Sequence, residues 1–304
     1  MKLLNFGSMN TDYVYKVDHF VTKGETISAD ALQVFGGGKG LNQSIALSRA
    51  GEKVYHAGTV GKDGGLLLDI LNRDGVDTSC VTVHEDSQTG HAIIQNDSMG
   101  DNCIIVFGGA NQSVGKEQVD RVLSGFDEGD YILLQNEINE LDYIIRQAAG
   151  KGMKIVLNPS PMNHKIFGLP LDMVDYFLVN EAEAAALSDA PGADEDTVLK
   201  SLIEKFPKAS IVMTLGEKGS VYWDGGRICR QHAVPADAVD TTAAGDTYTG
   251  YFISGIIRGL NTEKVLYRAS VASSIAVTRA GAAPSIPVQK EVEAMMTKIE
   301  RRNE

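Results

Sequence analysis

Short apolar runs alternate with amphipathic stretches along most of the chain. The apolar runs lie at 2–7, 53–61, 130–135, 154–160, 175–180 and 210–216. Because these runs are nearly continuous, they predict strands buried on both faces, as in a parallel sheet. Helical patterns lie at 41–50, 64–74, 116–124, 139–150, 181–188 and 194–206, and again at 244–260, 263–280 and 288–302. This alternation predicts βαβ units with helices on both faces of the sheet.

Two segments break the alternation. Residues 11–35 and 88–108 contain short apolar–polar runs and polar turns, with no helical pattern between them. Such runs are typical of antiparallel strands and predict a small sheet over one edge of the main domain. No internal repeat or Pro/Gly/Ser-rich linker is visible, so we expect one α/β domain over residues 1–304 with a small β extension.

Composition narrows the class of protein. Of 304 residues, 43% are hydrophobic. The chain has 28 Lys and Arg residues and 40 Asp and Glu residues, which gives a net charge of −12. This balance argues against a nucleic-acid partner but not against small phosphates, which backbone N–H groups can hold. No apolar stretch approaches the roughly 18 residues of a membrane span. Cys80, Cys103 and Cys229 show no C-x-x-C spacing. We therefore expect a cytoplasmic protein with no membrane partner.

The stretch "AVDTTAAGDTYTGYF" (238–252) places a carboxylate where an extended segment meets a helix. Ala243, Ala244 and Gly245 carry no bulk, so their N–H groups can converge into an anion hole ahead of the helix. Asp246 lies in the first helical turn, where the helix dipole favours its ionised form, and it could accept a proton from an attacking hydroxyl. An isolated Asp is more often found at a helix N-terminus only because acidic residues are favoured there, but the run of small residues before Asp246 favours a catalytic role.

A second candidate is "FGGGKGLNQSIALSRAG" (35–51). Its glycines permit close backbone approach to a ligand, and a helix follows directly. The Walker A pattern is absent, and Leu41 breaks G-x-G-x-x-G. The stretch is either a glycine-rich turn or a ligand-binding loop.

Three weaker signals also follow predicted strands. Asn180 and Glu183 either hold hydrated Mg²⁺ or cap a helix. The glycine turn at 214–219 either faces a phosphate or closes a hairpin, and Asn10 and Asp12 either bind a polyol or begin a turn. Ligands bind an open α/β sheet at the carboxyl ends of its strands, so distant segments can share one cleft there.

The motifs "GGGKGLNQS", "LNPSP", "NEAE", "TLGEKG", "DTTAAGDTYTG" and "VTRAGAAPSIP" occur in this order over nearly the whole chain. Together they resemble the ribokinase-like (PfkB-type) carbohydrate kinases. The resemblance implies a three-layer α/β fold with a mostly parallel central sheet flanked by helices. It also implies a small β-sheet lid, here within about 11–35 and 88–108, through which a homodimer can form. The implied reaction is the phosphorylation of a sugar hydroxyl from ATP with Mg²⁺, activated by a monovalent cation, usually K⁺.

The resemblance also implies roles for individual residues. Asp246 corresponds to the catalytic base, and Ala243, Ala244 and Gly245 to the anion hole. Sugar contacts are implied for Asn10, Asp12, Gly38, Lys39, Asn42 and Glu137. Contacts to the nucleotide phosphates and Mg²⁺ are implied for Asn180, Glu183, Thr214, Gly216 and Gly219, and a position near the adenine for Ser270. The monovalent-cation loop corresponds to Asp240, Thr242, Ala276, Arg279, Gly281 and Ser285, mostly through backbone carbonyls.

Several positions depart from the family pattern. Asn136 stands where Leu is common, Val179 and Ala182 where Pro and Thr are usual, Ser270 where many members have Asn, and "PSPMN" replaces "PAPA". None of these departures removes a catalytic group. We expect D-ribose, phosphorylated on its 5-hydroxyl, as the substrate. The alternatives are another pentose, a ketohexose or a nucleoside, or a sugar-binding sensor without turnover. An oxidoreductase is disfavoured because G-x-G-x-x-G fails.

Overall fold

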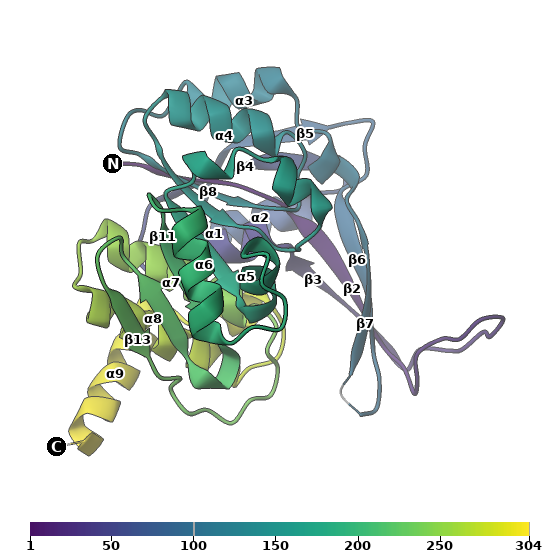
Figure 1. The fold of residues 1–304 in the computed structure, drawn as a ribbon. Helices are drawn as coiled ribbons and strands as arrows, with labels where there is room; N and C mark the ends of the chain where they lie inside the picture. The colour runs from purple at the N-terminus through teal and green to yellow at the C-terminus, as the bar shows by residue number, and fades with distance from the viewer. Residues whose placement is uncertain (100, 304) are drawn as a thin grey trace.

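The described part of the chain is built around a nine-stranded sheet (Figure 1). The computed structural model describes residues 1–99 and 101–303. The strand order is β13-β12-β11-β10-β9-β8-β1-β4-β5, with β1 parallel to both β4 and β8. The strands are β1 (Leu3–Phe6), β4 (Val54–Gly61), β5 (Asp77–His84), β8 (Tyr131–Gln135), β9 (Lys154–Asn158), β10 (Tyr176–Asn180), β11 (Ser210–Thr214), β12 (Ser220–Trp223) and β13 (Ile228–Gln231).

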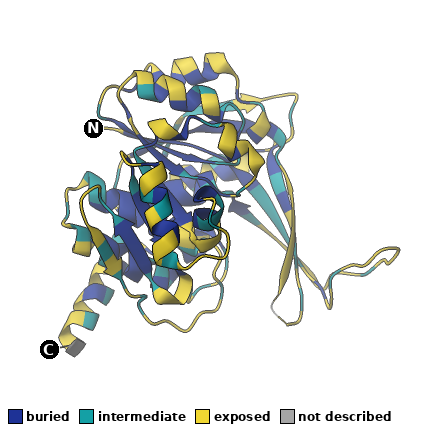
Figure 2. Ribbon diagram, viewed as in Figure 1, coloured by how far each residue is buried: buried dark blue, intermediate teal, exposed yellow. Residues whose placement is uncertain are grey.

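Helices cover both faces of this sheet, which gives the three layers expected from the sequence (Figure 2). One face packs against α3 (Lys116–Leu123), α4 (Leu141–Gly150), α5 (Glu181–Leu187) and α6 (Glu195–Lys205). The other packs against α1 (Lys39–Arg49), α2 (Gly65–Arg73), α7 (Ala244–Ile257), α8 (Thr262–Ala276) and α9 (Gln289–Asn303). Successive residues of a strand point to opposite faces, so Leu4 and Leu3 contribute to different cores. The continuous apolar runs in the sequence follow from this double burial.

A second sheet of four strands extends away from the main body (Figure 1). Its order is β3-β2-β6-β7, with β2 (Asn10–Lys16), β3 (Ala31–Gly37), β6 (Gly90–Asn96) and β7 (Asn102–Phe107). These strands lie within or beside the two segments in which the helical pattern is missing. Within each segment the strands pair antiparallel as expected, β2 with β3 and β6 with β7, but the two segments join through the parallel pair of β2 and β6. Between them the chain crosses the main body through α1, β4, α2 and β5 and returns in the same direction.

The large sheet ends in strands that the apolar pattern did not predict. One edge is β5, and the other is the antiparallel hairpin of β12 and β13. In β13, exposed and half-buried residues alternate, because an edge strand has fewer covered neighbours and needs no continuous apolar run. Among the described residues, no helix is both long and apolar enough to cross a membrane.

Candidate active site

The site forms where α1 and α7 meet above β1. Gly250 of α7 packs so closely on α1 that an added Cβ would lie 2.4 Å from the Cβ of Ala46. Gly40 of α1 packs equally closely on the chain after β1, where an added Cβ would lie 2.4 Å from the backbone nitrogen of Ser8. The absence of side chains at these two positions lets α7 pack closely on α1, and α1 on the chain after β1.

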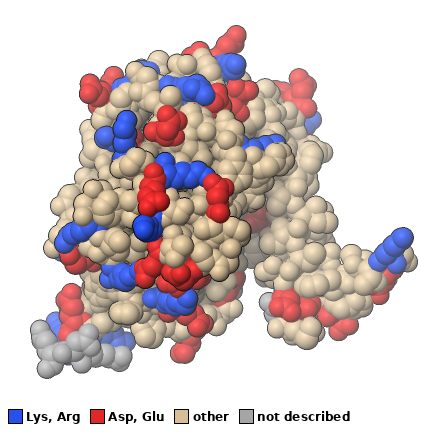
Figure 3. Space-filling view, in the orientation of Figure 1, with Lys and Arg blue, Asp and Glu red and all other residues tan. Residues whose placement is uncertain are grey.

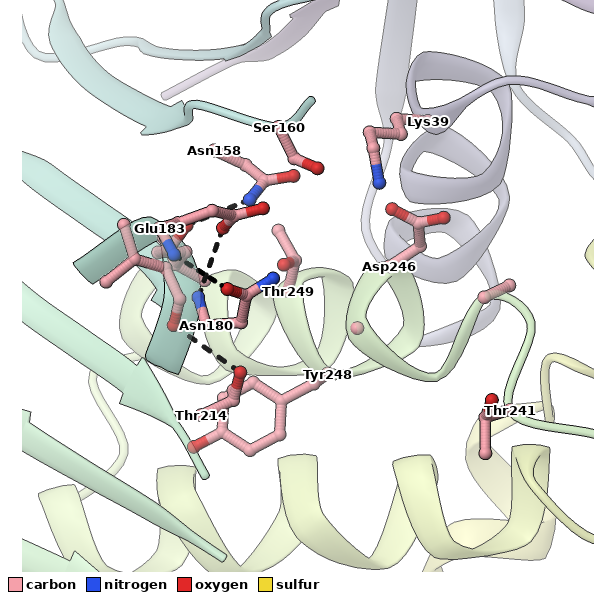
Figure 4. A pocket seen from close by; sticks show the side chains of 14 residues that line it. Lys39, Asn158, Ser160, Asn180, Glu183, Thr214, Thr241, Asp246, Tyr248 and Thr249 are labelled. Atoms are coloured by element: carbon pink, nitrogen blue, oxygen red, sulfur yellow. Dashed lines mark hydrogen bonds between the residues drawn. The ribbon is translucent and has the colours of Figure 1, made fainter. Parts of the chain in front are cut away.

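Asp246 is buried in the first turn of α7, and two amides from α1 hold its carboxylate. Asn42 Nδ2 donates to Oδ2 at 3.1 Å, and Gln43 Nε2 donates to Oδ1 at 2.8 Å. Figure 4 shows the Lys39 ammonium directed toward the same carboxylate. The carboxylate is thus held in one orientation by neutral donors and faced by a cation, and a general base needs such fixed positioning.

Lys39 and Glu137 are charged residues that interact with Asp246. Burial opposes the charge on Lys39, but the carboxylates of Asp246, Glu137 and Glu183 outweigh it and raise the pKa of the amine above its usual value. Burial also raises the pKa of Glu137, although the Ser8 hydroxyl and the Lys39 backbone N–H both donate to its Oε2. Lys39 therefore remains a cation inside a group of carboxylates.

The residues predicted to contact a sugar lie beside this charge cluster, at the base of the small sheet. Gly38 precedes α1 with a φ of 89°, a value that favours glycine. Asn10 is buried, and its Oδ1 accepts from Asn111 Nδ2 at 2.7 Å. The Asp12 carboxylate lies against Gly37, where a Cβ would approach one of its oxygens to 1.9 Å. Burial, aided by the charge of Glu137, raises the pKa of Asp12 to about 7.

The N-terminus of α7 has an unusual backbone conformation. Ala243 has a φ of 59°, a left-handed conformation that costs an alanine about 1 kcal/mol or more. The Ala244 N–H donates to Thr241 O at 3.2 Å. Among the described residues, no atom accepts from the N–H groups of Ala243 and Gly245. These two groups are therefore available to an anion.

Two adjoining cavities open beside this turn, one of about 200 Å³ and the other of about 550 Å³. They share four lining residues, which are Thr214, Thr241, Gly245 and Tyr248. The smaller cavity is also lined by Lys39, Asn158, Asn180, Glu183 and Asp246 (Figure 4). The larger lies between the turn at 214–219, the segment at 233–241 and α8. Gly245 therefore stands at the junction of a charged chamber and a more apolar one.

Asn180 and Glu183 form a complete helix cap and also line the smaller cavity. Asn180 Oδ1 accepts from the Glu183 N–H at 2.9 Å, and Glu183 Oε2 accepts from the Asn180 N–H at 3.1 Å. No described residue donates to the remaining carboxylate oxygen of buried Glu183. The two interpretations of this pair, a cap and a ligand site, are therefore compatible.

The remaining candidates line the larger cavity or lie behind α7. Thr214, Gly216, Gly219 and Ser270 line the larger cavity. Asp240 joins two segments of the predicted cation loop, because its carboxylate accepts from the N–H groups of Thr242 and Gly281, each at 2.8 Å. Ala276 O accepts from the Arg279 N–H, and the Arg279 side chain turns to Glu291. Ser285 is buried and donates to Ala282 O.

Sequence reasoning missed residues that hold these groups in place. Gln43 and Asn158 lie within the quoted motifs "GGGKGLNQS" and "LNPSP", and each contributes a buried or half-buried amide to the site. Their position directly beside Asn42 and at the end of a strand was the only signal. Asn111 and Ser8, which hold Asn10 and Glu137, carried no signal that the pattern analysis used.

Comparison with known proteins identifies one family. The model of the pfkB family carbohydrate kinases matches residues 1–289. A ribokinase of Haemophilus influenzae is 31% identical over 291 residues, covering 94% of this chain and 95% of that protein.

Solved structures agree with this comparison. A ribokinase of Thermotoga maritima superposes with a TM-score of 0.85 at 35% identity, covering 97% of this chain and 99% of that one. A ribokinase of Arabidopsis thaliana, solved with ribose and ATP, has a TM-score of 0.85 at 29% identity and covers 96% and 97% of the two chains. The fold expected from the sequence, including the small sheet, is confirmed by these matches.

Proposed function

The chain belongs to the pfkB family of carbohydrate kinases, and we propose that it transfers the γ-phosphoryl group of ATP to the 5-hydroxyl of D-ribose. As a member of this family it is a phosphotransferase that acts on an alcohol group. Ribose and ATP are the molecules held by the Arabidopsis thaliana relative. The observation that carries the proposal is the buried Asp246 carboxylate, fixed by two amides in the smaller cavity directly after Gly245, where the two cavities meet.

Asp246 acts as the general base. A sugar held by Asn10, Asp12, Gly38, Lys39, Asn42 and Glu137 presents its primary hydroxyl to the carboxylate. The proton moves to Asp246 as the oxygen attacks phosphorus, and Asn42 and Gln43 keep the carboxylate oriented during the transfer. Sugar and nucleotide thus approach Asp246 from opposite sides.

The N-terminus of α7 receives the charge that develops on the transferred group. The Ala243 and Gly245 N–H groups have no acceptor among the described residues, so they donate to phosphoryl oxygens without losing a bond. The Ala244 N–H completes the anion hole if its 3.2 Å bond to Thr241 O is given up. In-line transfer needs this kind of positioning and electrostatic stabilisation more than covalent chemistry.

The donors in the smaller cavity fit Mg²⁺. Glu183 offers a buried carboxylate oxygen without a partner among the described residues, and Asn180 lies beside it. Oxygen ligands of this kind suit an ion that keeps several of its waters. We assign Glu183 as the group that holds the hydrated ion, which when bound neutralises charge on the phosphates.

A monovalent cation, K⁺ by preference, would occupy the loop formed by Asp240, Thr242, Ala276, Arg279, Gly281 and Ser285. The Asp240–Gly281 bond that joins two segments of this loop supports the proposal. Among the described residues, no group of three or more His, Cys, Asp and Glu surrounds a possible metal site. Ligation by backbone carbonyls is therefore the mode that we propose for K⁺.

The test is ADP release by purified protein against a panel of pentoses, ketohexoses and nucleosides. Each sugar is assayed with Mg²⁺ and either K⁺ or Na⁺, with wild type and Asp246→Asn side by side. We expect ribose to give the highest kcat/KM, stimulation by K⁺, and a loss of about 100-fold or more in the variant. If ribose binds but no sugar is phosphorylated, the protein is a sensor and the proposal fails.

We also propose that the protein is a homodimer formed through the small sheet. Val34, Tyr13, Ile93 and Ile105 lie side by side in one row across its four strands. Val34, Ile93 and Ile105 are exposed, the last to 61%. In Figure 3 this extension carries few charges away from its tip. A second copy of the chain could cover this apolar row.

The cysteines support the proposal of a cytoplasmic location. Cys80, Cys103 and Cys229 are all free. Unpaired thiols, one of them exposed, persist most readily in a reducing compartment.

A further inference from the structure

A buried chain of amides runs from β1 to Asp246. We propose that Gln43 and Gln135 are positioning residues, which aim an amide N–H group at the base and prevent the opposite orientation. The inference rests on the proposed function, because it assigns a purpose to the surroundings of Asp246. Gln135 ends β8, is fully buried, and lies one amide away from the carboxylate.

The orientation of this row of side-chain amides is set at one end by a backbone carbonyl. Asn5 Nδ2 donates to Gly40 O at 2.7 Å and to Ser44 Oγ at 2.8 Å. Because a carbonyl can only accept, the amide nitrogen of Asn5 must lie on that side. Its Oδ1 therefore faces Gln135, whose Nε2 donates to it at 2.9 Å.

The second hydrogen of the Gln135 amide determines how Gln43 is turned. Gln135 Nε2 also donates to Gln43 Oε1 at 2.7 Å. With its oxygen occupied, Gln43 can offer only N–H groups on its other side. They donate to Asp246 Oδ1 at 2.8 Å and to Asn158 Oδ1 at 3.1 Å.

A second backbone carbonyl sets the orientation at the other end of the row of amides. Asn158 Nδ2 donates to Leu178 O at 2.9 Å, so its Oδ1 faces Gln43. Both ends thus require the same orientation of Gln43. The reverse orientation would place the Gln43 oxygen against the Asp246 carboxylate and leave buried donors and acceptors mismatched, which is costly.

The experiment removes the donors without removing volume. Gln43→Met takes the N–H group away from Asp246, and Gln135→Glu replaces a double donor with a group that can only accept while ionised. Gln118→Met is the matched control, because Gln118 is also buried and bonded, to Gly58 O and Thr59, away from the site. Thermal unfolding of each variant reports whether it folds. If Gln43→Met does not fold, the Gln135→Glu variant carries the test.

We expect Gln43→Met and Gln135→Glu to lower kcat about 10- to 100-fold, while KM for ribose changes less than about twofold. Gln118→Met should match wild type in kcat. A double-mutant cycle on kcat with Asp246→Asn distinguishes an effect through the base from a general structural defect. If the amides act through the base, Gln43→Met adds no further loss in the Asp246→Asn background.

Other outcomes overturn the inference. An unchanged kcat, a rise in KM equal to the fall in kcat, or an additive loss in the cycle would each show that the amides do not act through Asp246. Wild-type protein that phosphorylates no sugar, or Asp246→Asn with full activity, would instead reject the proposed function, and with it a base for the amides to position.

Discussion

A side chain that helps to bind a ligand can destabilise the ligand-free protein, and Asp12 is the clearest case in this site. Its pKa is raised from 3.8 to about 7 by burial and by the nearby Glu137. Between those values the folded state binds more protons than the unfolded state, so this group makes stability fall as the pH rises. Above pH 7 the sugar-free protein carries the full cost of a buried charge.

Asp12→Asn should therefore stabilise the sugar-free protein by about 1–3 kcal/mol at pH 8 and by little at pH 4. Urea unfolding at both pH values measures the difference, and ribose affinity should fall in the same variant. Asp86→Asn is the control, because Asp86 is an exposed aspartate that forms no part of the proposed site. An equal gain at both pH values would contradict the assignment.

Gly245 provides a second prediction at the residue scale. Among the described residues, no atom lies within 4 Å of the position its Cβ would take, although the residue lines both cavities. Gly245→Ala should leave the unfolding temperature unchanged or slightly higher, because alanine favours helix. It should lower kcat about tenfold or more, because the methyl group occupies the space of an anion.

The control for Gly245→Ala is Gly65→Ala. Gly65 is exposed at the start of α2, and an added Cβ there also meets no described atom within 4 Å. Both variants gain the same methyl group near a helix start, and only the first should lose activity. Equal kcat values for the two would remove Gly245 from the anion site.

At the scale of elements, the contact between α1 and α7 sets the distance from Asp246 to its amides. Gly250→Ala places a methyl group where Ala46 Cβ would lie 2.4 Å away, so one helix must move. We expect a loss of about 1–3 kcal/mol in the free energy of unfolding and a lower kcat. Denaturant unfolding and steady-state kinetics measure the two effects.

A compensating change tests this interpretation. Ala46→Gly removes the nearest clashing atom, so adding it to Gly250→Ala should restore part of both the stability and kcat. Full wild-type behaviour of Gly250→Ala alone would show that the helices do not need this close approach.

The elements also show what the sequence could predict. The buried parallel strands were predictable because burial on both faces demands continuous apolar runs, and Asn180 and Thr214 because each ends such a strand. The edge strands β5 and β13 and the parallel pairing of β2 with β6 were not. Half-exposed strands need no distinctive pattern, and pairing direction depends on the path of the whole chain.

The amide network was beyond sequence reasoning for a related reason. Asn5, Gln43, Gln135 and Asn158 lie far apart in the chain, and each alone is an ordinary polar residue. Only the fold brings them together, and only their shared hydrogens give them a direction. Asp246, by contrast, could be recognised from its immediate neighbours.

At the scale of the whole molecule, the small sheet is the surface through which we propose that two chains form a dimer. If a second copy covers the row of Val34, Tyr13, Ile93 and Ile105, light scattering should give twice the mass of one chain, and Ile105→Lys should give monomers. Ile104→Lys is the control, because Ile104 is also exposed but points to the other face of β7. A monomeric wild type, or equal effects of both changes, would contradict the proposed dimer.

The proposed base, Asp246, and the amides of Gln43 and Asn42 lie 203 and 204 positions apart in the sequence. During synthesis on a ribosome, the residues proposed to hold the sugar emerge long before Asp246 does. If Asp246 is the base, a half-made chain carries most of the residues proposed to contact the sugar but lacks the group that accepts the proton, so it should not consume ATP. The order of translation delays catalysis until α7 has emerged to pack on α1.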